Sequence, residues 1–352
     1  MIDLKAGIEK GKIQKESDEI EYFYLHEHYQ HYERGTVFIG DRTIFGYPHI
    51  RRIFVIKEGI KRNIKSKFVY LEEKIDGFNL RIANIDSKVY AFSRGGHLDY
   101  FSTEKTRHNR EILSFLSDNP EYVLCAEMVG NTPHTKPTKK FDTKLFVFDI
   151  MREDGSLLPC EEKYELLDNY KINQVPRLGK VASSDIKKIS SIVILVHKQN
   201  AEGIVIRGTL GETVKHVNAN SDIADISECS LRYFDMPSGF FHQRIMRAAF
   251  FANEFGLNKV ELSKKLGNAF LNSLTPSIKK AKNAKSSFEE FEILISSLSL
   301  WQKIKRQMGN EILVEEIWRK NEGKNIRLRF KKIYRKTSSL LHSFSSGKAI
   351  ED

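Results

Sequence analysis

Short apolar runs dominate the chain between residues 68 and 217, separated by segments that contain Gly, Asn, Asp or Pro. Their length and their β-branched and aromatic content are typical of strands. The pattern predicts strands at residues 68–71, 80–85, 89–92, 122–126, 145–150 and 204–206. Apolar residues three and four positions apart predict helices at 103–116, 160–169 and 185–195. This mixture of elements predicts an α+β fold.

The pattern changes after Pro237, where helical spacing replaces strand signals. Residues 239–255, 257–273, 287–300 and 313–319 carry this spacing, which predicts an all-helical C-terminal region of hairpins or a small bundle. We expect an N-terminal module at residues 1–60, a core domain at 61–235, a helical domain at 236–312 and a basic C-terminal module at 313–352.

The charge of the chain favours a polyanionic partner. Its 352 residues include 57 Lys and Arg against 46 Asp and Glu, which gives a formal charge of +11. The stretch from Arg319 to Lys336 contains part of this excess. Within it, residues 326–330 alternate apolar and basic side chains, which would place the basic groups on one face of a strand. Binding of an RNA backbone and a merely solvated face explain this stretch equally well.

Three widely spaced cysteines, Cys125, Cys160 and Cys229, form no disulfide framework and are expected to be reduced. The start of the chain lacks the apolar run of a signal peptide, and no stretch approaches the length of a membrane-spanning helix. We therefore expect a cytoplasmic protein with no membrane partner.

The most informative motif is the run from Glu72 to Arg81, which reads Glu-Glu-Lys-Ile-Asp-Gly-Phe-Asn-Leu-Arg. It places Lys74 at the end of a strand, and Gly77 would let the backbone approach a ligand. At a reference pKa of about 10.4, very little of a lysine amine is unprotonated at neutral pH, so a nucleophilic Lys74 needs nearby cations or desolvation. Alone, the motif also fits a surface lysine in a hairpin turn.

Further motifs follow in order at residues 93–96, 126–130, 144–150, 201–207 and 214–216, each with a polar residue in a strand or at its end. This ordered set resembles the covalent nucleotidyltransferases, which comprise DNA ligases, RNA ligases and capping enzymes. Residues 46–54 and 234–245 narrow the resemblance to the archaeal-type homodimeric ATP-dependent RNA ligases, over roughly residues 35–255. It implies a nucleotidyltransferase core of antiparallel, ATP-grasp-like sheets and helices.

The resemblance also implies the chemistry. Lys74 would attack the α-phosphorus of ATP, AMP would pass to an RNA 5′-phosphate, and a 3′-hydroxyl would displace AMP and seal the strand. The expected substrate is single-stranded RNA with a 5′-phosphate and a 3′-hydroxyl. Joining the two ends of one strand, which circularises it, is one of the expected reactions. Aligning the reacting groups and neutralising phosphate charge are then the main tasks of the protein.

Site residues follow by position in the matched motifs. Arg94 would contact ribose or phosphate, Glu127 the ribose hydroxyls and Phe148 the adenine, although a Phe in an apolar strand usually only packs in the core. The full set expected to bind ATP is Glu72, Glu73, Asn79, Arg94, Glu127, Phe148, Arg207 and Lys215.

Asp149 and Glu202 are the expected ligands of Mg²⁺ or Mn²⁺, because such hard cations favour carboxylate and water oxygens. A second possible metal site, at His26, His28 and His31, lacks any matching ligand set elsewhere in the sequence.

Two departures from the wider superfamily count against a DNA ligase. Asn79 stands where many members have arginine, and Val217 where many have a second lysine. The rival enzymes, a DNA ligase or a capping enzyme, usually place an OB-fold after the last lysine motif. The alternative that is not an enzyme is an RNA-binding protein that does not catalyse a reaction. The family is dimeric, and residues 237–310 are the expected dimer surface.

Overall fold

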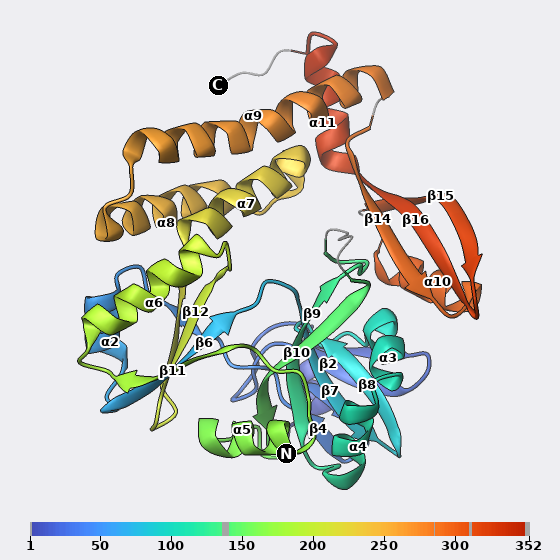
Figure 1. The fold of residues 1–352 in the computed structure, drawn as a ribbon. Helices are drawn as coiled ribbons and strands as arrows, with labels where there is room; N and C mark the ends of the chain where they lie inside the picture. Colours follow the sequence, from blue (N-terminus) through green and yellow to red (C-terminus); the bar gives the residue numbers. More distant parts are fainter. Residues whose placement is uncertain (1, 136–140, 285, 310–311, 349–352) are drawn as a thin grey trace. The chain divides into compact units, whose positions relative to one another are not determined.

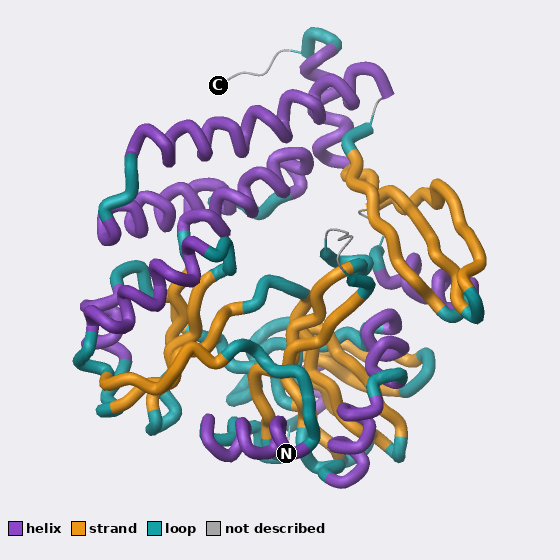
Figure 2. The backbone as a smooth tube through the Cα atoms, in the orientation of Figure 1, coloured by secondary structure: helices purple, strands orange, loops and turns teal. Residues whose placement is uncertain are grey.

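The computed structural model describes residues 2–135, 141–284, 286–309 and 312–348. The chain forms two compact units, residues 1–50 with 76–175 and residues 51–75 with 176–352 (Figure 1). The predicted α+β mixture is confirmed, since helices and largely antiparallel sheets alternate along the chain (Figure 2). The expected four-part division stays a prediction.

The first unit contains two four-stranded sheets. One has the order β1-β2-β3-β4, built from Ile13–Ser17, Glu21–Leu25, Val37–Ile39 and Arg42–Ile44. The other has the order β10-β9-β7-β8, built from Thr143–Met151, Val123–Gly130, Phe78–Ile85 and Lys88–Ser93. A shared core that includes Tyr22, Ile44, Phe92 and Met151 holds the two sheets together.

The helices of this unit are short. They are α1 (Leu4–Glu9), α3 (Tyr100–Arg107), α4 (Arg110–Asp118) and α5 (Cys160–Asn169). The single helix predicted at 103–116 is divided, because the Asn109 side chain accepts a hydrogen bond from the Ile112 amide and begins a new helix. The helix predicted at 160–169 is confirmed.

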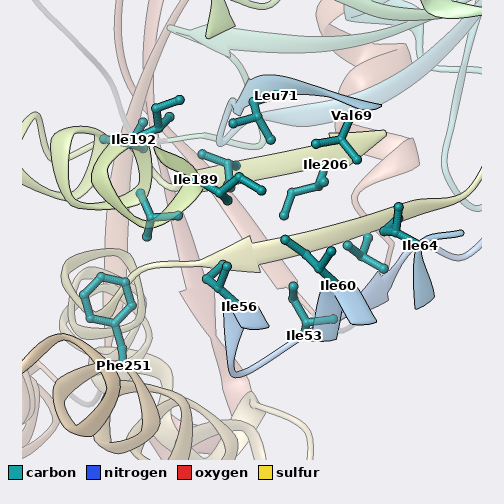
Figure 3. Close-up of a cluster of buried hydrophobic side chains, with 14 of the residues drawn as sticks. Ile53, Ile56, Ile60, Ile64, Val69, Leu71, Ile189, Ile192, Ile206 and Phe251 are labelled. Carbon is teal, nitrogen blue, oxygen red and sulfur yellow. The ribbon is translucent and has the colours of Figure 1, made fainter. Parts of the chain in front are cut away.

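The second unit is built on a five-stranded sheet of order β11-β6-β12-β13-β5. Its strands are Arg177–Ala182, Phe68–Lys74, Gly203–Gly208, Thr213–Val217 and Arg51–Arg52, and only β13 and β5 run parallel. Helices α2 (Ile56–Asn63) and α6 (Ile186–Lys198) cover one face of it. Figure 3 shows the buried residues between them, which include Ile56, Ile60, Leu71, Ile189 and Ile206.

Helices α7 (Ala219–Cys229), α8 (Phe240–Phe255) and α9 (Lys259–Ala284) follow the sheet and lie side by side, after which the chain turns to strands (Figures 1 and 2). A 3₁₀ segment, η1 (Ser230–Asp235), links α7 to α8. The last part contains β14 (Phe288–Ile295), α10 (Leu298–Gln307), β15 (Ile312–Glu322), β16 (Asn325–Tyr334) and α11 (Arg335–Ser345).

The helical prediction is right for residues 239–255 and 257–273 and wrong for 313–319 and most of 287–300. Phe288, Phe291 and Ile295 fit a helical spacing, yet Phe291, Ile293 and Ile295 also alternate as a strand requires. Pairing with β16 decides between the two, because it buries the alternating set against Trp301 and Phe330. No helix among the described residues has the length and apolar content needed to span a membrane.

We expect that Ile206→Ala lowers the free energy of unfolding by about 2–5 kcal/mol, because Ile206 is fully buried between the sheet and its helices. Urea unfolding followed by circular dichroism measures this loss. The control is Leu195→Ala on α6, where the side chain is 52% exposed. Equal losses for the two variants would contradict the position of this core.

Candidate active site

Lys74 is the last residue of β6, and its amine pairs with Glu202. The Lys74 Nζ lies 2.5 Å from Glu202 Oε2, and the two side chains are 21% and 12% exposed. Strand pairing explains the contact, because Lys74 lies opposite Gly203, the residue after Glu202. The amine is therefore accessible to a ligand and held by a carboxylate.

One step back along β6, Glu72 forms an ion pair with Arg207. Arg207 Nε lies 2.5 Å from Glu72 Oε2, and both side chains are almost completely buried. The contact links β6 to β12, and loss of either partner alone would leave a buried charge without compensation.

The sheet has one polar and one apolar face. Residues directly opposite each other across the strands share a face, which groups Glu72 with Val205 and Lys215, and Lys74 with Gly203. The alternate residues, Leu71, Ile204 and Val214 among them, belong to the buried core. Lys74, Glu72, Arg207 and Lys215 thus lie on the polar face.

Glu73 differs from Glu72, Lys74, Arg207 and Lys215, because its side chain does not lie on the polar face. It lies opposite Ile204, so the register assigns it to the apolar face, away from Lys74 and Glu72. Burial raises the pKa of Glu73 above its usual value. Its expected part in binding ATP stays a prediction.

Asn79 and Glu127 come together in the first unit. They lie opposite each other on β7 and β9, and Asn79 Nδ2 is 3.3 Å from Glu127 Oε1. Asn79 Oδ1 is buried and accepts no hydrogen bond from the described residues. A ligand hydroxyl or amine would satisfy this oxygen.

Sequence reasoning missed Phe146, which lies opposite Glu127 on β10 and shares the face of Asn79 and Glu127. Phe148 comes two residues later, at a bulge between Val147 and Asp149, and contacts the Tyr47 ring edge-on at 5.1 Å. The alternating aromatic residues of 144–150 were the signal, but the bulge that separates their positions leaves no mark in the sequence.

Asp149 is deeply buried, with 1% of its surface exposed. It accepts a hydrogen bond from the Tyr47 hydroxyl, and the Lys163 amine lies 3.6 Å from its other oxygen. These contacts serve the packing of the unit, so Asp149 fits a metal ion less well than the partly exposed Glu202 does.

Arg94 is exposed in the turn after β8, whereas Arg81 is completely buried. Arg81 donates hydrogen bonds to the carbonyl oxygens of Phe45 and Ser93, each at 2.8 Å. Burial lowers the pKa of Arg81 to about 10, and the nearby positive charge of Arg94 acts in the same direction. Arg81 therefore ties β7 to its neighbours, and the exposed Arg94 stays a predicted contact of ribose or phosphate.

Gly77 has a packing role. A Cβ atom at this position would lie 2.6 Å from the Met128 carbonyl oxygen, so only glycine fits beside β9. The described residues contain no group of three or more His, Cys, Asp or Glu arranged to hold a metal ion, which also applies to His26, His28 and His31. Any metal would depend on ligand oxygens as well.

Two family models match the chain. Residues 67–219 match the model of RNA ligase, and residues 229–348 match the C-terminal region of the ligase Pab1020. Together they cover most of the chain, including Lys74, Glu127, Glu202 and Lys215. Residues 67–219 therefore belong to the RNA ligase family. The predicted enzyme class, a ligase, is confirmed.

The similarity to individual relatives covers nearly the whole chain. An uncharacterized protein of Methanocaldococcus jannaschii is 29% identical over 97% of this chain and 92% of its own length. A putative ATP-dependent DNA ligase from Aquifex aeolicus has a TM-score of 0.92 at 29% identity over 99% of each chain. An archaeal ATP-dependent RNA ligase has a TM-score of 0.90 at 23% identity, over 99% of this chain and 96% of its own, which shows a shared fold.

The basic strand near the C-terminus of the ligase is largely neutralised by its neighbours. Arg327 pairs with Glu292 and Glu322, and Arg329 and Lys331 pair with Glu290 and Glu315, respectively. The alternation predicted at 326–330 is confirmed as β16, with its cations on one face. A role in RNA binding stays a prediction.

Replacing one partner of the buried Glu72–Arg207 pair should lower the free energy of unfolding more than replacing both partners. We expect Glu72→Gln to lower the free energy of unfolding by about 3–5 kcal/mol, because it leaves the Arg207 charge buried without its carboxylate. The double variant Glu72→Leu with Arg207→Met should recover much of the loss. Urea unfolding of the three proteins tests this, and an undiminished loss in the double variant would contradict it.

Proposed function

We propose that the protein is an ATP-dependent RNA ligase that joins 5′-phosphate and 3′-hydroxyl ends through a lysyl-AMP intermediate. The observation that carries the proposal is the accessible Lys74 amine at the end of β6, paired with Glu202 inside the matched RNA ligase domain. The archaeal relative, an ATP-dependent RNA ligase, supports the same activity.

In the first step the Lys74 nitrogen attacks the α-phosphorus of ATP. A phosphorus–nitrogen bond forms, the bond to the bridging oxygen breaks, and pyrophosphate leaves. The amine must lose a proton to attack, and the Glu202 carboxylate, 2.5 Å away, is in position to accept it.

In the second step an RNA 5′-phosphate oxygen attacks the same phosphorus, and the bond to Lys74 breaks. In the third the RNA 3′-hydroxyl attacks the 5′-phosphate of the adenylated RNA and releases AMP. Each step exchanges one bond at phosphorus for another, so Lys215 on the polar face would serve to stabilise phosphate charge, and Arg207 would do so only by leaving its buried pair with Glu72.

Binding of the nucleoside would fall to residues of the first unit. Asn79 and Glu127 offer an amide and a carboxylate to the ribose, Arg94 offers an exposed guanidinium, and Phe148 remains the candidate for the adenine. We add Phe146 as an alternative aromatic partner, since it shares a face with Asn79 and Glu127.

Glu202 is the better of the two predicted metal ligands, because its carboxylate is partly exposed whereas both oxygens of Asp149 face protein groups. A bound Mg²⁺ or Mn²⁺ would neutralise phosphate charge. One carboxylate together with substrate phosphates and water suits Mg²⁺, which seldom needs a cage made by protein alone.

The first step can be tested with α-labelled ATP. We expect the wild-type protein to retain label through denaturing electrophoresis, because lysyl-AMP is covalent, and Lys74→Ala to retain none. Lys67→Ala, which removes an exposed lysine just before the same strand, is the matched control and should label normally.

Two outcomes would favour other activities. Label from GTP and not from ATP would indicate a capping enzyme, and sealing of nicked DNA in preference to RNA would indicate a DNA ligase, as the Aquifex aeolicus relative is named. Helices α7, α8 and α9 follow Lys215 where capping enzymes usually have an OB-fold, which counts against a capping enzyme.

We also propose that the ligase is a homodimer, which uses apolar side chains of α8 and α9. Met246 and Phe250 lie one turn apart on α8, and Val260, Leu271 and Ile278 share one face of α9. They are 40–79% exposed, which is unusual for side chains of this size on helices.

The double variant Met246→Glu with Leu271→Glu should change a dimer into a monomer of 40.8 kDa, because each change buries a charge at the interface. Light scattering after size exclusion measures the mass. Leu210→Glu, at a position 75% exposed outside this region, is the control and should remain dimeric. A monomeric wild-type protein would contradict the proposal.

A further inference from the structure

Arg52 lies within the motif at residues 46–54 but has no role among the predicted site residues. It ends the short strand β5 and lies opposite Lys215 in the parallel pairing of β5 with β13. Lys215 in turn lies opposite Val205, which lies opposite Glu72. The register therefore brings Arg52 to the edge of the polar face that carries Lys74 and Arg207.

The guanidinium of Arg52 is partly buried and has no carboxylate of its own. Among the described residues it makes no hydrogen bond and no ion pair. Burial lowers the pKa of Arg52, and the positive charges of Arg247 and Arg244 act in the same direction, whereas Asp222 and Glu202 oppose them. Arg52 thus lies among charged groups of both signs.

The carboxylates near Arg52 are already engaged by other cations. Arg247 Nε lies 2.8 Å from Asp222 Oδ1 and 3.1 Å from Oδ2, and Glu202 pairs with Lys74. A partly buried cation without a counter-charge is costly, and an anionic ligand would remove that cost. The planar fork of a guanidinium is suited to two phosphate oxygens.

We propose that Arg52 binds the β- and γ-phosphates of ATP, which leave as pyrophosphate when Lys74 is adenylated. Lys215, beside it in the sheet, shares the same phosphates. A polyphosphate is the favoured ligand, because Arg52 and Lys215 lie opposite each other at the edge of the polar face and two neighbouring cations suit several phosphate oxygens. This inference rests on the proposed ligase function and adds a residue to it.

Inorganic pyrophosphate in the presence of Mg²⁺ is the direct probe. We expect Arg52→Gln to weaken its binding to the full chain by at least about tenfold in calorimetry, since a charge-assisted contact is lost. Arg52→Lys, which keeps the charge without the fork, should fall between it and the wild type. Arg51→Gln is the matched control, since Arg51 is the exposed neighbour on the same strand and should bind as the wild type does.

Three reactions then show whether Arg52 binds the phosphates of ATP or those of RNA. Adenylation by ATP and release of AMP from the adenylated enzyme by pyrophosphate should both fall in Arg52→Gln, whereas joining of an RNA adenylated beforehand should be retained. Unchanged pyrophosphate binding, or an equal loss in Arg51→Gln, would overturn the proposal. Loss of joining with normal adenylation would also overturn it and would assign Arg52 to RNA.

Failure of the ligase function itself would look different. A wild-type protein that forms no lysyl-AMP would contradict the proposed function, while the binding of pyrophosphate would still report whether Arg52 holds this anion. Circular dichroism of each variant, compared with the wild type, separates a lost contact from a lost fold.

Discussion

The antiparallel pairing of β6 with β12 is the constraint on which the candidate site depends. It places Lys74 opposite Gly203, beside Glu202, and brings Glu72 to Arg207 two residues further along. Because side chains alternate across a sheet, a shift of one residue would turn Lys74 toward the buried core. The fully buried residues of the opposite face, such as Leu71 and Ile206, resist that shift.

The same sheet therefore connects stability with chemistry. Its apolar face is covered by α2 and α6, and this cover leaves the polar face to carry the charged groups. The two ion pairs on this face differ in a useful way. Glu72 and Arg207 are shielded from water and hold the strands, whereas Lys74 and Glu202 are partly exposed and can exchange partners.

Part of the positive charge of the chain is compensated by neighbouring carboxylates. On β16 the cations Arg327, Arg329 and Lys331 face glutamates of the neighbouring strands, so these three charges are largely compensated. Exposed ion pairs of this kind contribute little energy individually, but they do offset the field that would attract a polyanion.

The sequence by itself determined the strands β7, β8, β9 and β10, the strands β6 and β12, the lysine at the end of β6 and the family resemblance, because local alternation and ordered motifs are readable without contacts. It could not decide the strands after residue 286, where Phe288, Phe291 and Ile295 satisfy two periods and only pairing with β16 selects one. The strand partners of Arg52 and Phe146 and the bulge at Phe148 were equally invisible, since each depends on which strands become neighbours. Tertiary structure alone decided that Glu73 lies on the opposite face from Lys74 and that Asp149 is held by Tyr47 and Lys163, because strand register and burial arise from contacts between residues far apart in the chain.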